Sequence, residues 1–356
     1  MIINPRLEID IEKFKENIQT VVGICQEKGI QVAGVTKGFC AMEELAQAYK
    51  DGGCQYIADS RILNLKKIHH IDLPKMLIRI PMLSQAEEVV QYADISLNSE
   101  LTTMRALNEA AKKQDRTHGV ILMVDLGDLR EGYQDEYQLF EDLDTIYQEL
   151  DHLQIKGIGA NLTCFGGVLP DTYNMMRLVT VANYLRDTYD LNIPIVSGGN
   201  SSTLTLLLEG HDLPGVNQLR LGEALLFGTE ASYGKRIPHT HDDVFKLVAE
   251  VVEVKEKPTV PKGETATNAF GETMEFEDQG NRIKAICAIG EQDVHYEAIQ
   301  PIQDHVKIIG ASSDHLILDV DDLTQDLKVG DEVAFSLHYM ALLSLMTSEY
   351  VRKVIV

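Results

Sequence analysis

Long apolar runs are absent from this 356-residue chain, and none approaches the length that a membrane-spanning helix needs. The N-terminal segment also lacks the charged-then-apolar pattern of a secretory signal. We therefore expect a cytoplasmic protein without a membrane partner.

Cysteines are few and scattered, at positions 25, 40, 54, 164 and 287. Their number is odd and no two stand at metal-ligand spacing, so neither a disulfide framework nor a metal site is expected. Free cysteines are mostly buried structural residues. Cys40 and Cys164 differ from the others, because each lies just past the end of an expected strand.

Basic residues are scarce, with 32 lysines and arginines against 55 acidic residues and a formal net charge of −23. Nucleic acids and anionic membranes bind through clustered basic residues, so both are excluded as expected partners. The acidity favours a cationic small substrate only weakly, because an acidic surface that keeps the protein soluble is the simpler explanation.

What the chain does contain is a unit repeated eight times between Gln31 and Arg220: a short apolar run, a polar turn and an amphipathic helical stretch. Alternating strands and helices specify parallel βαβ units, and eight of them predict an α/β fold with a (β/α)8 TIM barrel. The expected strands cover residues 32–36, 56–58, 76–80, 93–97, 120–124, 155–159, 194–197 and 216–220.

After Gly228 the pattern changes to strands with few helices, which predicts a mostly β C-terminal domain. We expect domains at 1–235 and 236–356. The alternating segment Leu7–Ile11 precedes the eightfold repeat and is expected to join the second domain's sheet. The stretch 255–281 has no apolar period and is predicted to be a long loop, either a surface excursion or a functional lid or dimer contact.

In (β/α)8 proteins the chemistry lies where the strands end. The residues that follow the expected strands are polar, and they include Lys37, Asp59, Asn98, Asp125, Arg130, Asn161, Gly198–Ser202 and Arg220. We therefore expect a polar site at one mouth of the barrel.

Lys37 directly follows the first barrel strand, where low-dielectric walls disfavour a charged amine. An activated lysine forms Schiff bases with carbonyls, including the aldehyde of pyridoxal phosphate. After the seventh strand comes the turn Gly198–Ser202, which we expect to lead into a helix whose first turn offers Ser201 and Ser202 to a phosphate. One cofactor could thus be held at both ends.

Arg220 ends the eighth strand, where it could meet the cofactor ring from the side. A guanidinium does not give up its proton, so an arginine facing a pyridine nitrogen keeps that nitrogen unprotonated. This weakens the ring as an electron sink and suits racemisation, which needs only a brief carbanion at Cα.

Several ordered motifs resemble the alanine racemase family of pyridoxal-phosphate enzymes, in particular its ornithine-specific racemases. They span nearly the whole chain and comprise Arg6–Asp10, Val35–Gly38, Val124–Gly132, Asn200–Leu204, Leu219–Gly228, Ile57–Lys67, Asn161–Cys164 and Gly310–His315. The resemblance implies a homodimer that binds an amino-acid substrate, with active sites at the subunit interface.

The resemblance also implies roles for single residues. Lys37 would carry the cofactor and Arg130 would orient groups near it. The further residues expected to contact the cofactor are Asn161, Asn200, Ser201, Ser202, Arg220, Gly222 and, from the second domain, Tyr339.

Two positions depart from the family pattern. Asn161 stands where alanine racemases usually have a histidine against the ring, and Ala288–Asp293 stands where they have a Tyr-Gly that supplies the opposite acid or base from the other subunit. Asp293 and His295 are the candidates for this second catalytic group, and Cys164 is the alternative.

We interpret the chain as a pyridoxal-phosphate amino-acid racemase for ornithine or another basic amino acid. The alternatives are an alanine racemase proper and a non-catalytic pyridoxal-phosphate carrier, although a carrier does not need a second domain to close its site. A decarboxylase would need cysteine and acidic motifs that the second domain lacks.

Overall fold

The computed structural model describes residues 3–268, 270–271 and 273–356. The chain divides into two compact units, Glu12–Asp242 and Met1–Ile11 with Asp243–Val356. The expected boundary after residue 235 falls inside the last loop of the first unit. No helix in the described chain is long and apolar enough to span a membrane.

The first unit is a closed barrel of parallel strands that follow one another in chain order, with β9 pairing back onto β2. This confirms the predicted (β/α)8 architecture. The strands are β2 (Gln31–Val35), β3 (Tyr56–Asp59), β4 (Lys75–Leu77), β5 (Ile95–Asn98), β6 (His118–Val124), β7 (Leu153–Ala160), β8 (Ile195–Ser197) and β9 (Gln218–Leu221).

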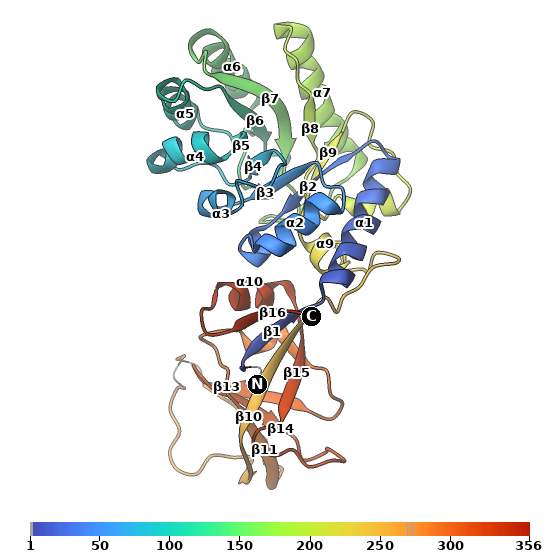
Figure 1. The fold of residues 1–356 in the computed structure, drawn as a ribbon, viewed down its shortest axis with the longest axis vertical. Coiled ribbons are helices and arrows are strands. Elements are labelled where there is room, and N and C mark those ends of the chain that lie inside the picture. Colours follow the sequence, from blue (N-terminus) through green and yellow to red (C-terminus); the bar gives the residue numbers. More distant parts are fainter. Residues whose placement is uncertain (1–2, 269, 272) are drawn as a thin grey trace. The chain divides into compact units, whose positions relative to one another are not determined.

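Helices surround these strands, as Figure 1 shows. Each presents an apolar face to the barrel; α1, for example, buries Phe14, Ile18 and Val21 at helical spacing. The helices are α1 (Ile11–Glu27), α2 (Glu43–Asp51), α3 (Ile62–Lys67), α4 (Ala86–Tyr92), α5 (Leu101–Lys113), α6 (Glu136–Glu149), α7 (Thr172–Tyr189), α8 (Leu204–Leu208) and α9 (Glu223–Phe227), with the short 3-10 helix η2 (Leu83–Gln85) before α4.

An aromatic cluster packs beneath the first strand end. The ring centroids of Phe39 and Tyr49 lie 5.5 Å apart, and Phe14 lies 5.5 Å from Tyr49. A Cβ atom on Gly34 would come within 2.6 Å of the Tyr49 ring, so this strand position requires glycine. The three rings come from α1, α2 and the segment after β2, and the Tyr49 hydroxyl donates to the Val35 carbonyl at 3.1 Å, so the cluster supports the end of β2.

The second unit is a mostly antiparallel sheet, which confirms the predicted β-rich domain. Its first strand, β1 (Arg6–Ile9), comes from the N-terminus and pairs with both β10 and β16, and Figure 1 shows the first and last strands together. The other elements are β10 (Phe245–Pro258), β11 (Asn281–Cys287), η3 (Tyr296–Ala298), β12 (Ile299–Pro301), β13 (Lys307–Ala311), β14 (Leu316–Asp319), β15 (Glu332–Leu337), α10 (Tyr339–Thr347) and β16 (Arg352–Ile355).

The long loop is shorter than predicted. Strand β10 continues to Pro258, because its last residues pair in register with the start of β11 at Asn281. The Thr259 N–H donates to the Gly280 carbonyl at 2.9 Å, so residues 259–280 form the connection of a hairpin. Ala269 and Glu272 of this connection lie outside the described residues.

A buried histidine makes the stability of the barrel depend on pH. His118 is 1% exposed, its Nε2 lies 2.8 Å from Ser96 Oγ, and burial lowers its pKa to about 4. Between pH 6.5 and 4 the unfolded chain binds a proton at this site that the folded chain does not, so stability falls as the pH falls through this window, by about 3 kcal/mol in all.

We expect His118→Gln to remove this part of the pH dependence. The measurement is the free energy of unfolding from urea titrations at pH 7, 5.5 and 4.5. His152→Gln, which changes a more exposed histidine, is the control and should follow the wild type. A His118→Gln protein with the wild-type slope would show that His118 is not the group responsible.

Candidate active site

Lys37 begins the 3-10 helix η1 (Lys37–Phe39) directly after β2. The preceding Thr36 donates from Oγ1 to Asp59 Oδ2 at 2.6 Å, and Asp59 Oδ1 accepts from the Arg61 N–H at 2.7 Å. These buried bonds tie the ends of β2 and β3 together. Asp59, one of the polar residues expected at the mouth, therefore supports the position of Lys37 rather than facing a ligand.

The Lys37 amine is reachable from solvent and makes no hydrogen bond or ion pair with the described residues. Enclosure by the barrel rim disfavours the ammonium form and lowers the pKa of Lys37, and the positive charge of Arg130 acts in the same direction. The neighbouring Cys164 and Glu131 oppose this shift without reversing it. The neutral, nucleophilic form of the amine is therefore easier to reach than in a free lysine.

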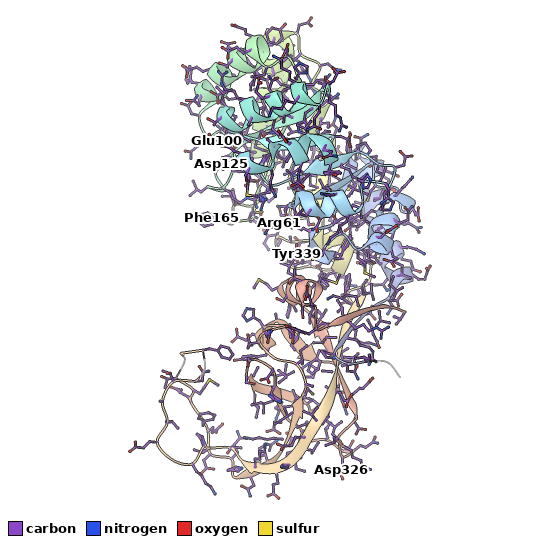
Figure 2. All side chains as sticks on the ribbon, turned by 60° about the vertical axis from the view of Figure 1, so that its left-hand side comes forward. Arg61, Glu100, Asp125, Phe165, Asp326 and Tyr339 are labelled. Atoms are coloured by element: carbon purple, nitrogen blue, oxygen red, sulfur yellow. The ribbon has the colours of Figure 1, made fainter. Side chains whose placement is uncertain are left out.

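Other residues that follow barrel strands lie on the same side. Figure 2 shows this for the four labelled side chains, which follow β3, β5, β6 and β7: Arg61, Glu100, Asp125 and Phe165. Asn98, also expected at the mouth, is buried and donates from Nδ2 to the Ser96 carbonyl at 3.0 Å. It therefore braces the end of β5.

The loop after β6 presents Arg130. Asp125 Oδ1 accepts from the N–H groups of Gly127 (2.9 Å) and Leu129 (3.2 Å), which curls the chain back. Gly132 has a φ of +132°, and a Cβ there would lie 2.5 Å from the Asp125 backbone nitrogen. Only glycine permits this close approach, and the closed loop holds Arg130 at the mouth.

Asn161 follows β7 and joins several of the predicted residues. Its Oδ1 accepts from Asn200 Nδ2 at 3.2 Å and from Arg220 Nη2 at 3.3 Å, while its Nδ2 donates to Glu131 Oε1 at 3.0 Å. The Asn200 amide also donates to Cys164 Sγ at 3.3 Å. Asn161 thus connects neighbouring polar groups across the mouth.

Arg220 on β9 is 3% exposed, and burial lowers its pKa to about 10. Its Nη2 donates to the Ala160 carbonyl at 2.7 Å and its Nη1 donates to Ser197 Oγ. The Nε makes no hydrogen bond to the described residues. The guanidinium is therefore fixed by its two terminal nitrogens and keeps one donor for a ligand.

The glycine-rich turn differs from the prediction in one respect. Helix α8 begins at Leu204, so Ser201 and Ser202 lie in the turn before the helix and not in its first turn. Ser201 Oγ accepts from the Ala224 N–H at 3.2 Å, whereas Ser202 Oγ is buried without a hydrogen-bond partner in the described chain. Gly222 is the N-cap residue of α9. Of the two serines in this turn, Ser202 therefore keeps a hydroxyl that can bind a ligand.

Three predicted residues lie in the β-rich unit. Tyr339 is half-buried at the start of α10. Asp293 is 9% exposed and its Oδ1 accepts from Ser348 Oγ at 2.5 Å, whereas the His295 side chain is 65% exposed, with Nδ1 2.7 Å from Glu291 Oε2. The two candidates for the second catalytic group therefore differ. Asp293 is buried and hydrogen-bonded to Ser348, whereas the His295 side chain is exposed to solvent.

Two acidic residues of the loop after β6, Asp128 and Glu131, had no predicted role. Asp128 is buried and accepts from the N–H groups of Cys164 (3.1 Å), Phe165 (3.0 Å) and Val168 (3.1 Å). Burial alone would raise the pKa of Asp128, but these bonds outweigh it and lower the pKa. Glu131 bonds to both Arg130 and Asn161. Their only signal in the sequence is their place beside Arg130.

These residues suit a phosphorylated aldehyde cofactor. Comparisons with known proteins identify a family of the same kind. The family model "Alanine racemase, N-terminal domain" matches residues 9–230. The chain therefore belongs to the alanine racemase family.

Two relatives match over nearly the full length. The chain is 47% identical to the ornithine racemase of Acetoanaerobium sticklandii, over 98% of this chain and 99% of that protein. It is 37% identical to the lysine racemase of Thermotoga maritima, over 99% of this chain and 98% of that protein.

Solved structures share the fold. The alanine racemase of Bartonella henselae, described with covalently bound pyridoxal phosphate, has a TM-score of 0.75 at 20% identity, with 100% of both chains covered. The alanine racemase of Clostridium difficile 630 has a TM-score of 0.77 at 18% identity, covering 100% of this chain and 96% of that one.

Proposed function

We propose that this protein is a pyridoxal-phosphate-dependent racemase of basic amino acids, acting on ornithine or lysine. The observation that carries the proposal is the Lys37 amine, which follows the first barrel strand with its pKa lowered and makes no hydrogen bond or ion pair with described residues. Full-length similarity to racemases of ornithine and of lysine supports the substrate class.

The residues present fit pyridoxal phosphate. Lys37, Ser202 and Arg220 each keep a polar atom without a hydrogen-bond partner among the described residues. Lys37 would bind the aldehyde, Ser202 Oγ and Gly222 the phosphate, and Arg220 Nε the ring nitrogen. When bound, this cofactor supplies a sink for the electrons left at Cα.

The chain's own groups would then move the proton. Lys37 Nζ, with its lowered pKa, is the base that removes the Cα proton on one face of the substrate. Arg220 cannot release a proton to the ring nitrogen, so the electron sink stays weak and side reactions are disfavoured. A second group must return the proton on the opposite face.

Chiral chromatography tests the proposed reaction. We expect the loaded protein to convert L-ornithine or L-lysine into an equal mixture of both enantiomers, and to reach the same mixture from the D-enantiomer, because the two have equal free energies. A product that is not the other enantiomer, or conversion of alanine alone, would contradict the proposal.

We also propose that the enzyme is a cytoplasmic homodimer in which the β-rich unit of one subunit supplies the second catalytic group to the other. His295 is the better candidate, because its imidazole is exposed, whereas Asp293 is buried and bonded to Ser348. Activity should then require the dimer, which sedimentation and activity over the same concentration range would show.

We expect His295→Ala to slow proton return on one face about 10²-fold, while cofactor affinity stays unchanged. Asp293→Asn should have a smaller effect. The measurement is deuterium incorporation at Cα, starting from each enantiomer separately. His315→Ala, another solvent-exposed histidine of the same unit, is the control. Wild-type rates for both test variants would instead make Cys164 the leading candidate.

A further inference from the structure

Glu131 lies in the loop after β6 and matches no expected catalytic position. Its side chain is 16% exposed, and its carboxylate accepts two hydrogen bonds from the Arg130 guanidinium, one to each oxygen. Asn161 Nδ2 adds a third bond to Oε1 at 3.0 Å. One carboxylate therefore holds side chains from the loops after β6 and β7.

These contacts differ from an ordinary surface ion pair. An exposed pair contributes little, because water screens the charges and the side chains lose freedom. Here the carboxylate is mostly enclosed, and its bond to Asn161 determines how that amide is oriented. An ionised carboxylate only accepts, so Nδ2 of Asn161 must face Glu131 and Oδ1 must face the donors of Arg220 and Asn200.

Glu131 also balances charge in the mouth. Lys37, Arg130 and Arg220 are cations or potential cations there, and within the described chain Glu131 is the carboxylate that bonds to one of them. Burial lowers the pKa of Arg220, and the charge of Glu131 is the largest influence that opposes this shift.

We propose that Glu131 is a positioning residue that fixes Arg130 directly and Arg220 through the Asn161 amide. The role rests on the proposed function, because Arg220 is the group expected to face the ring nitrogen. Glu131 itself touches neither substrate nor cofactor in this account. Its removal should free Arg130 and allow the Asn161 amide to turn, which withdraws an acceptor from Arg220.

The test uses the full-length protein loaded with pyridoxal phosphate. Glu131→Gln keeps the side-chain shape, but its NH2 group must face a nitrogen of Arg130 that donates to the carboxylate in the wild type. The double variant Glu131→Gln with Asn161→Asp restores the bond between these two positions, because the new amide at position 131 can donate to the new carboxylate at position 161, which accepts from Arg220 and Asn200. The bond from Arg130 Nη2 to Oε1 is not restored, because the new NH2 group takes the place of that oxygen. Glu136→Gln, which changes an exposed glutamate paired with Arg177, is the matched control.

We expect Glu131→Gln to lower kcat/KM about 10²-fold, the effect of a misplaced active-site group, and the double variant to recover to within about tenfold of the wild type. Glu136→Gln should match the wild type. Loss of activity in Glu131→Gln without recovery in the double variant would overturn the positioning role.

A second measurement needs no substrate. The charged neighbours of Lys37 are Arg130 and, when ionised, Asp59, Glu131, Cys164 and Glu223. Removing the Glu131 charge disfavours a cation at Lys37, so the pH midpoint of the bound cofactor's visible absorption should fall in Glu131→Gln. An unchanged midpoint contradicts the proposal. Because this shift is read without turnover, it stays informative if no basic amino acid is racemised.

Discussion

Lys37→Ala is expected to abolish covalent attachment of pyridoxal phosphate and to lower racemisation by at least about 10⁴-fold. The substitution removes both the amine that bonds to the aldehyde and the base on one face of Cα. The Lys37 side chain makes no hydrogen bond or ion pair with described residues, so its loss should leave the fold intact. The measurements are the visible absorption of the purified protein and peptide mapping after borohydride reduction.

Lys28→Ala is the matched control for this experiment. Lys28 precedes the same strand at its opposite end and pairs with Asp212 at 2.7 Å. This variant should retain the absorption band, the reducible adduct and the wild-type rate. A Lys37→Ala protein that keeps the band and still yields a reduced covalent adduct would show that another lysine carries the cofactor.

Arg220→Glu is expected to lower the racemisation rate about 10²- to 10³-fold and to raise the share of transamination product. A carboxylate at this position would let the ring nitrogen hold a proton, which strengthens the electron sink and opens the side reaction. The same change leaves the Ala160 carbonyl and the Ser197 hydroxyl without their donor. Product analysis by chromatography of the keto acid measures the ratio.

Arg220→Lys separates the electronic effect from the structural one. Lysine keeps the positive charge but lacks the fork that bonds to Ser197 and Ala160 at once, so the rate should fall without an increase in the keto acid. Thermal unfolding of both variants identifies any loss of folded protein. An unchanged product ratio in folded Arg220→Glu would refute the role given to the guanidinium.

The sequence predicted the barrel because its strands are short apolar runs at regular spacing, and the strand ends then identified the mouth. Lys37 and Arg220 could be found in this way, since each lies at the end of a strand. Where each strand begins and ends depends on its hydrogen bonds to the neighbouring strands, which the apolar pattern does not predict. Strand β4, for instance, ends at Leu77, before the end of the predicted run.

The network around Asn161 could not be predicted in the same way. Its bonds join loops that follow different strands, and their partners depend on side-chain orientations that the spacing of residues does not encode. Glu131 was visible only as the residue after Arg130. Likewise, Asp293 and His295 are two residues apart in the sequence, but packing buries one and exposes the other.

Proton exchange at Cα tests the central claim most directly. The loaded protein is incubated in heavy water with L-ornithine, L-lysine or L-alanine, and the Cα proton is followed by NMR. We expect loss of this proton from ornithine or lysine together with formation of the D-enantiomer, and far slower exchange with alanine. Absence of exchange with both basic amino acids, or exchange without inversion, would contradict it.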